Sequence, residues 1–351
     1  MLFTIDVAGD FVGGWLVTDN PAATPVLTVV LKSGRERRAL KSDLFRPDLK
    51  NAGLHSTGLC GFVLDQETCP GFEPGQPIEV YDAASNLLMY RFAAGADAPV
   101  RLFHLETQTF PVYPVARHLS PLVQLVYADA DMIAEETLAN LLYLPWTSVL
   151  VSGAILLRNY EGPLEAGAYD RVVLLCDPLR ELAGRLIRAK ALAAEETDAA
   201  TWRRLGQGAL IETVADVDLT DAAALARALR RMPDEDFFAL GNPTLRKLVA
   251  KLPNAPLDKH HVGSGLDSLA GFAVVGFEDE FERFVEDLEA LVGRDSLPRE
   301  RLPGPPELAP VMEALRSCRP AEELLQLDEA LYALARGAFE KARVDDPMEA
   351  A

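Results

Sequence analysis

Five short runs of consecutive apolar residues in the second part of the chain limit the folds open to it. A strand with one face in water alternates apolar and polar residues, whereas a strand covered on both faces is apolar throughout. Helical patterns lie between these runs, so we expect an α/β domain of three layers with a parallel sheet. The runs are VRLFHL (100–105), LVQLVYA (122–128), WTSVLVSG (146–153), RVVLLC (171–176) and FAVVGF (272–277), and the helical patterns cover 134–143, 178–196, 221–232 and 279–293.

The first part of the chain has a different pattern. Segments rich in β-formers, such as GWLVTD and VLTVVLKSG, are separated by Gly, Pro, Asn and Asp, with no long helical pattern. This predicts a small, all-β, sandwich-like domain over residues 1–95, followed by the α/β domain over 100–351. The small residues of AAGADAP (93–99) suit a junction, and 351 residues exceed the ~100–150 typical of one domain. Near the C-terminus we expect an irregular segment over 294–310 and a helix over 321–343.

The charge and the apolar content restrict partners and location. A net charge of −19, from 53 acidic and 34 basic side chains, repels phosphate backbones, which argues against nucleic acid as a partner. No run approaches the ~18 apolar residues of a transmembrane helix, and the opening MLFTIDVAGDF lacks a basic flank. We expect a cytoplasmic protein.

The sequence gives little support for a metal site. The four cysteines, Cys60, Cys69, Cys176 and Cys318, have no CxxC spacing, and we expect reduced thiols, with a Cys60–Cys69 bridge as the alternative. His260 and His261 fall in an expected loop without a carboxylate or Cys cluster at ligand spacing. We therefore expect no metal.

Several residues of the first domain have a recognisable spacing. Gly13-Gly14-Trp15 is followed by Phe45-Arg46-Pro47-Asp48-Leu49, then Gly53 and Gly61-Phe62. This spacing resembles a small β-domain found ahead of bacterial glycosyltransferases and sulfotransferases. Two interpretations stay open: Trp15 is a core anchor and Arg46 pairs with Asp48, or Trp15 and Arg46 form a surface for a glycan or another partner.

Six segments of the second part occur in a recognisable order. They are Phe103-His104-Leu105, Val151-Ser152-Gly153, Leu175-Cys176-Asp177-Pro178, and the segments 240–248, 272–281 and 327–332. Their order resembles that of bacterial sulfotransferases, which transfer a sulfonate from 3′-phosphoadenosine 5′-phosphosulfate (PAPS) and leave adenosine 3′,5′-bisphosphate (PAP). The resemblance covers about residues 100–343. It implies a P-loop-like fold and a role in bacterial surface-polysaccharide or glycoconjugate assembly.

The differences from the family pattern fall on its chemistry. Glu106 stands near the place of the Lys that holds the phosphosulfate, and Ala154 replaces the His that acts as base. Cys176 and Gly184 replace the Arg and Ser of the 3′-phosphate site, and its second Arg falls on Glu181. A carboxylate repels the donor, and a methyl group accepts no proton. The resemblance thus implies a pseudo-sulfotransferase that lacks a cofactor, is non-catalytic or nearly so, and binds a protein or glycan.

The alternative is an active PAPS-dependent sulfotransferase with a rebuilt donor site, acting on a glycan hydroxyl. It would bind PAPS or PAP through Thr107, Thr109, Arg158 and Arg180, with His104 or His118 as the base. The plainer interpretation makes His104 a structural histidine. In the same interpretation, Arg180, Arg185 and Arg188 form a solvated helix face with Glu181.

Overall fold

The computed structural model describes residues 1–32, 34–194 and 208–345. Internal contacts divide the chain into two compact units, and each is described by itself. Unit 1 consists of Met1–His104, Val115–Gly153 and Gly162–Asp170, and unit 2 consists of Leu105–Pro114, Ala154–Glu161 and Arg171–Ala351. This division cuts the chain several times, so the expected domain limits of 1–95 and 100–351 stay predictions.

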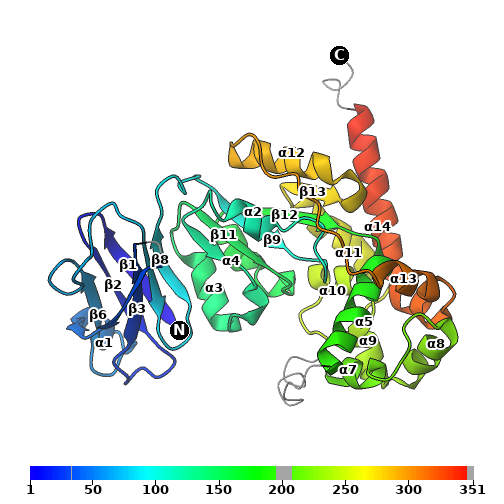
Figure 1. Ribbon diagram of the computed structural model, residues 1–351, viewed down its shortest axis with the longest axis horizontal. Coiled ribbons are helices and arrows are strands. Elements are labelled where there is room, and N and C mark those ends of the chain that lie inside the picture. Colours follow the sequence, from blue (N-terminus) through cyan, green and yellow to red (C-terminus); the bar gives the residue numbers. More distant parts are fainter. Residues whose placement is uncertain (33, 195–207, 346–351) are drawn as a thin grey trace. The chain divides into compact units, whose positions relative to one another are not determined.

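The N-terminal part of unit 1 contains two antiparallel four-stranded sheets (Figure 1). The first has the order β1 (Leu2–Ala8), β2 (Val12–Val17), β6 (Leu59–Leu64), β5 (Leu44–Phe45), and the second has the order β4 (Glu36–Lys41), β3 (Val26–Leu31), β7 (Ile78–Asp82), β8 (Leu88–Phe92). One short helix, α1 (Pro47–Asn51), interrupts them. Gly14 lies where a Cβ would collide with the Thr4 carbonyl oxygen of β1. The all-β character expected of this region is confirmed.

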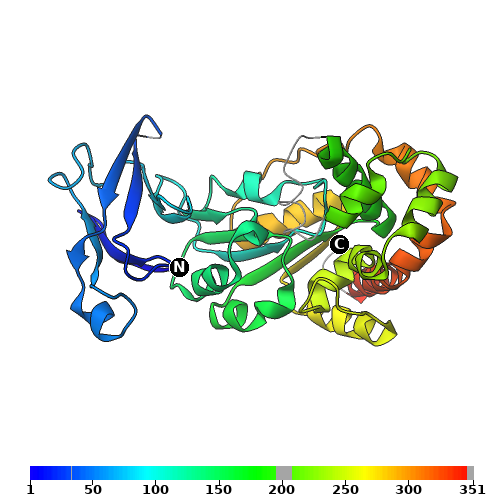
Figure 2. The same cartoon turned by 90° about the horizontal axis from the view of Figure 1, so that it is seen from below.

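The second part of the chain forms a five-stranded parallel sheet. Its order is β10 (Leu125–Tyr127), β11 (Val149–Gly153), β9 (Arg101–Leu105), β12 (Asp170–Leu175), β13 (Val274–Phe277). Each strand coincides with one of the five apolar runs, and Figure 2 shows helices on both sides of the strands. This coverage explains the nearly continuous apolar pattern of the strands, because side chains on both faces of the sheet pack against helices. The α/β class is confirmed.

Within unit 1 the antiparallel sheets contact the strands that follow them. The hydroxyl of Tyr127 in β10 donates to the Leu88 carbonyl of β8 at 3.0 Å. The rings of Phe3 and Trp146 lie with their centroids 6.4 Å apart. Three helices complete the unit: α2 (Val115–Leu119), α3 (Glu135–Tyr143) and the greater part of α4 (Glu161–Ala166). These contacts explain why the N-terminal sheets group with β9, β10 and β11.

Unit 2 contains the last two strands and the longer helices. The described α-helices are α5 (Pro178–Ala194), α7 (Gly208–Val214), α8 (Ala222–Arg231), α9 (Asp234–Leu240), α10 (Pro243–Val249), α11 (Lys259–Ala270), α12 (Phe281–Val292), α13 (Leu308–Arg316) and α14 (Arg319–Asp345). Consecutive residues of β13 show how both faces are covered. A Cβ on Gly276 would lie 2.5 Å from the Phe284 ring of α12. On the other face, the Phe277 ring packs 5.3 Å from the rings of Tyr332 and Phe339 in α14.

Three details differ from the sequence-based expectations. His260 and His261 lie in the first turn of α11 and not in a loop, because Asp258 and His261 form a reciprocal capping box that starts this helix. Residues 308–310, which were expected to belong to an irregular segment over 294–310, form the first residues of α13. The cysteines are all free and buried, so the alternative of a Cys60–Cys69 bridge is wrong.

The helices bear on whether the chain could cross a membrane. Within residues 1–32, 34–194 and 208–345, none is both long enough and apolar enough to span a bilayer.

Candidate functional site

The candidate site lies in unit 2, where the loop after β9 meets the start of α5. Two side chains tie this loop to the end of β12: the Thr107 hydroxyl donates to the Leu174 carbonyl at 2.9 Å, and Gln108 Nε2 donates to the same oxygen at 3.0 Å. From α10, Lys247 Nζ donates to the Thr107 carbonyl at 3.1 Å. The loop and Leu174 lie at the carboxyl ends of β9 and β12, and parallel sheets place their ligands at this edge.

Three backbone N–H groups of the loop donate to side chains of the chain itself. Gln108 N donates to Glu106 Oε1 at 3.0 Å, and Val112 N donates to Gln108 Oε1 at 2.9 Å. Thr109 N donates to Glu181 Oε2 at 2.7 Å, while the Thr109 hydroxyl donates to Glu181 Oε1 at 2.9 Å. A phosphate-binding loop directs such N–H groups at its anion. Here a carboxylate of α5 takes that place.

Glu181 is the residue on which this arrangement depends. Its side chain is 3% exposed, and a buried carboxylate is costly unless hydrogen bonds replace its water. Thr109 supplies these bonds, which is why loop and helix lie in direct contact. A Cβ on Gly184 would lie 3.3 Å from the Phe110 ring and 3.4 Å from the Thr109 Cβ. The glycine therefore admits the loop, in a position where the resemblance predicts a phosphate-binding Ser.

A backbone N–H group at the N-terminus of α5 also has a carboxylate of the chain as its acceptor. The Asp177 carboxylate accepts a hydrogen bond from Leu179 N at 2.8 Å. Helix N-termini attract anions through free N–H groups and the macrodipole, and an Asp at this position supplies the negative charge internally. An external anion at this terminus would meet the carboxylate of Asp177.

Arg180 and Arg158 pair with different carboxylates. Arg180 Nε lies 3.3 Å from Glu278 Oε2, with side-chain exposures of 11% and 15%, and its Nη1 donates to the Phe110 carbonyl. Burial raises the pKa of Glu278, and the nearby Arg180 opposes this shift. Arg158 Nη1 binds the Glu161 carboxylate at 2.9 and 3.0 Å, and its side chain is exposed. Both cations proposed for a rebuilt donor site thus have an internal partner.

The expectation that Arg180, Arg185 and Arg188 form a solvated helix face is wrong for the first two. Arg185 Nη1 donates to the Leu240 carbonyl at the end of α9 at 2.7 Å, and burial lowers its pKa. Carbonyls at a helix C-terminus carry partial negative charge and attract a cation. Arg188 alone of the three is exposed.

The two histidines considered as bases lie in unit 1. His104 is 2% exposed, its Nδ1 lies 2.8 Å from Ser152 Oγ, and burial lowers its pKa to about 3. Such an imidazole is neutral at pH 7 and a weak proton acceptor. His118 lies in α2 and is also buried.

The other two positions at which the resemblance implies a replaced residue, Ala154 and Cys176, differ in exposure. Ala154 follows β11 and is exposed, whereas Cys176 follows β12 and is buried. Burial raises the pKa of the Cys176 thiol well above its ordinary value. The thiolate form is therefore disfavoured, and Cys176 packs as a small apolar side chain.

In the antiparallel sheets, Trp15 and Arg46 have structural contacts. Trp15 is half-buried and packs against the cluster of Val17, Leu49 and Cys60. Arg46 makes a bidentate pair with Asp48 at 3.0 and 2.8 Å, and a further bond to Asp6. These hydrogen bonds raise the Arg46 pKa.

A buried network between α10 and α14 had no assigned role in the sequence interpretation. Asp328 of α14 accepts hydrogen bonds from Thr244 N at 2.9 Å and Leu245 N at 2.8 Å. In return, Asn242 Oδ1 accepts from Leu327 N at 2.9 Å and Asp328 N at 3.0 Å. Burial raises the pKa of Asp328 to about 6. The dipeptide Asn-Pro signals a turn before a helix, but its partner lies too far along the chain to be predicted.

Comparison with known proteins adds no assignment: no family model, no curated protein and no solved structure matches this chain. Among the described residues, no group of three or more His, Cys, Asp or Glu side chains is placed to hold a metal ion. The interpretation of the site therefore rests on its own geometry.

Proposed function

We propose that the chain is a cytoplasmic, non-catalytic relative of the bacterial sulfotransferases that binds a protein or glycan in surface-polysaccharide or glycoconjugate assembly. The observation that carries the proposal is the pair of hydrogen bonds from Thr109 to Glu181. The amide and the hydroxyl of Thr109 already donate to Glu181, so they are not available to the phosphosulfate. The Glu181 carboxylate also places a negative charge beside the position expected for that group. The setting in polysaccharide assembly follows from the family resemblance alone.

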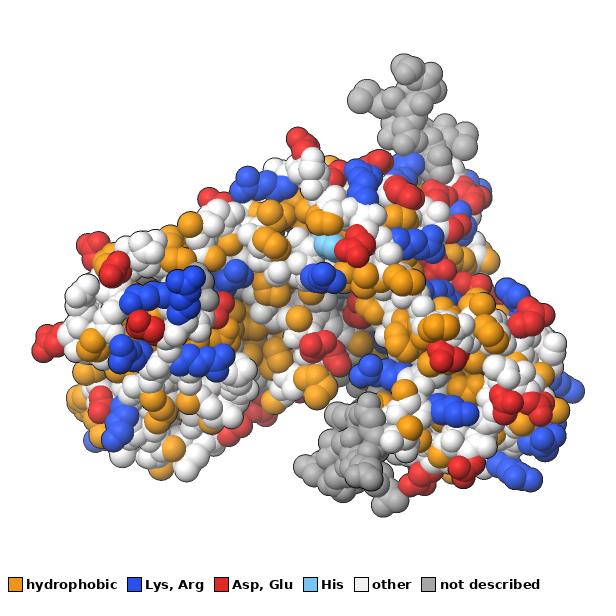
Figure 3. Space-filling view, in the orientation of Figure 1, with side chains coloured by type: hydrophobic (Ala, Val, Ile, Leu, Met, Phe, Trp, Pro, Cys, Tyr) orange, Lys and Arg blue, Asp and Glu red, His pale blue; other side chains and the backbone are white. Residues whose placement is uncertain are grey.

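The charges around the loop support the same proposal. PAP and PAPS are polyanions, and their binding requires charge-assisted contacts that Lys and Arg supply. Glu106, Asp177 and Glu181 contribute carboxylates here. Arg158 and Arg180 already pair with acidic side chains, and the ammonium group of Lys247 donates to the Thr107 carbonyl. Over the face of unit 2 drawn in Figure 3, basic and acidic side chains are interspersed.

The decisive experiment is a thermal-shift titration of the full chain with PAP, the desulfonated donor. A ligand at 100 times its dissociation constant stabilises by ~2.7 kcal/mol, which raises the melting temperature of a domain of 150–250 residues by about 5 °C or more. We expect no shift at millimolar PAP. Adenosine serves as the uncharged control, because a shift with both ligands reports nucleoside binding without the phosphates. A shift specific to PAP refutes the proposal and favours the active sulfotransferase.

The binding role has its own test. Affinity electrophoresis of the full chain through gels containing neutral or acidic soluble polysaccharides measures retardation by a glycan. Retardation that is lost on Trp15→Ala identifies a glycan partner at the first domain, and retardation unaffected by that change places it elsewhere. Absence of retardation in every gel removes the glycan and leaves a protein as the proposed partner.

A further inference from the structure

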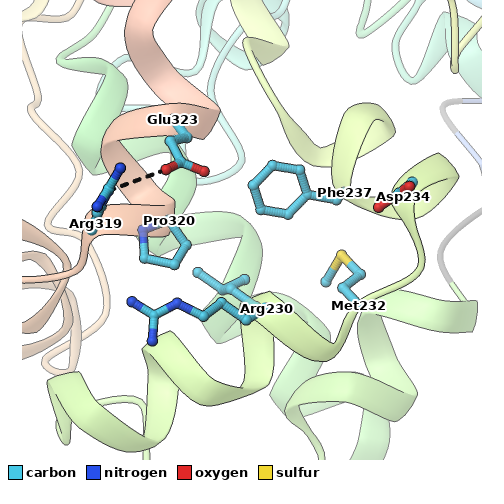
Figure 4. Close-up of a pocket in the computed structure, with 8 residues that line it drawn as sticks. Arg230, Met232, Asp234, Phe237, Arg319, Pro320 and Glu323 are labelled. Carbon is cyan, nitrogen blue, oxygen red and sulfur yellow. Dashed lines mark ion pairs between the residues drawn. The ribbon is translucent and has the colours of Figure 1, made fainter.

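Unit 2 contains a cavity of about 300 Å³ that is distant in sequence from the loop after β9. It lies where α8 ends, α9 begins and α14 begins (Figure 4). Pro233 separates α8 from α9, and α14 starts at Arg319-Pro320, so three helix ends leave a hollow between them. Ligand cavities of this size stand at the small end of the usual range.

One side of the cavity is cationic. The Arg230 side chain is exposed at the end of α8, and it forms no hydrogen bond or ion pair with the residues that the structure describes. Arg319 is 80% exposed, and its contact with Glu323 at 3.4 Å is a surface i,i+4 pair, a kind that contributes little. Two planar guanidinium groups at one site provide forked donors for a carboxylate.

The other side is apolar. Figure 4 shows Phe237 and Met232 across the cavity from Arg230 and Arg319, with Asp234 beyond the ring. Met232 is buried, whereas Phe237 is half-buried, so part of its ring remains open to a ligand. An aromatic ring and a thioether accept flat or branched apolar groups with little reorganisation. The cavity therefore has two guanidinium groups at one side, one of them paired with Glu323, and an aromatic ring and a thioether at the other, with the Asp234 carboxylate beside them.

We propose that this cavity binds a small carboxylate with an aromatic or branched aliphatic body. The carboxylate lies between Arg230 and Arg319, and the apolar body packs against Phe237 and Met232. Binding competes with Glu323 for Arg319. This site is independent of the loop at 106–110, so the proposal holds or fails separately from the proposed function.

The test uses isothermal titration of the full chain with phenylacetate and with 2-phenylethanol, its neutral counterpart. We expect phenylacetate to bind with a dissociation constant on the order of 1 mM, and 2-phenylethanol at least about tenfold more weakly, because it lacks the charge-assisted contacts. Arg230→Gln weakens phenylacetate binding by about tenfold or more. The matched control is Arg227→Gln, an exposed position one turn earlier on α8 that does not line the cavity.

A second variant tests the same idea in the opposite direction. Glu323→Gln removes the internal competitor of Arg319, so phenylacetate binds more tightly than to the wild type. Equal affinity for phenylacetate and 2-phenylethanol overturns the proposal, as does undiminished binding by Arg230→Gln. Absence of binding by the wild type at about 10 mM phenylacetate overturns it too.

Discussion

Replacing Glu181 by Ala tests whether this carboxylate holds the loop after β9 in place. The substitution removes two charge-assisted hydrogen bonds, from Thr109 N at 2.7 Å and Thr109 Oγ1 at 2.9 Å. Such bonds contribute ~1.5–3 kcal/mol each, and removing a buried carboxylate recovers part of that through its lost desolvation penalty. We therefore expect unit 2 to lose about 2–3 kcal/mol of unfolding free energy.

Urea denaturation of the full chain measures this loss, and hydrogen exchange of residues 106–112 locates it. Glu181→Gln keeps one acceptor and should lose about half as much. Arg188→Gln, on the exposed face of the same helix, is the matched control and should change stability by less than ~0.5 kcal/mol. If Glu181→Ala unfolds at the wild-type urea concentration and the Thr109 amide exchanges no faster, the loop is held by other contacts and the reasoning is refuted.

Three further predictions concern unit 2. The Asp328 carboxyl has a pKa of about 6 against an ordinary value of 3.8, so the folded state binds its proton more tightly. The protonated carboxyl stabilises the fold fully below about pH 4, and this contribution of about 3 kcal/mol is lost as the pH rises toward 6. Urea midpoints measured across this pH range should fall in the wild type, and Asp328→Asn should not show this fall. Gly276→Ala places a Cβ 2.5 Å from the Phe284 ring and should lower the free energy of unfolding by about 1–3 kcal/mol, measured by thermal unfolding. Adding Phe284→Leu to the same chain relieves the collision and should recover part of this free energy. Asn242→Ala leaves the amides of Leu327 and Asp328 without their acceptor and should lose about 2 kcal/mol in urea, whereas unchanged stability would mean that water replaces the side chain.

The parallel sheet was predictable because its signal is local. Each strand is apolar over most of its length, and turn-forming or helical segments adjoin it in sequence. Longer helices such as α5 and α12 have the same advantage, since their periodicity extends over several turns. The starts of α10 and α11 lack this advantage. The first amides of α10, a helix of 7 residues, bind the distant Asp328, and α11 begins at the capping box of Asp258 and His261.

The candidate site was predictable only through the proposed family resemblance, as a set of positions at which the expected residues would be replaced. That resemblance puts Glu181 where an Arg would be expected, but cannot reveal that its carboxylate accepts from Thr109, 72 residues earlier. The error over Arg180 and Arg185 has the same origin. Their charge suggests solvent, whereas tertiary packing gives each a buried or half-buried acceptor. Hydrogen bonds between distant segments leave no periodic trace in a sequence.

The hydrogen bonds that Asn242 and Asp328 accept from each other's segments have a consequence for how the chain acquires its structure during translation. Thr244 receives its acceptor from a residue made 84 positions later. The start of α10 therefore stays uncapped while the ribosome makes the intervening helices. During that time the Asn242 side chain also lacks the Leu327 and Asp328 amides to which it binds in the folded chain. Nascent chains that stop short of α14 should lack an ordered α10, so this half of the protein matures in one late step and not helix by helix.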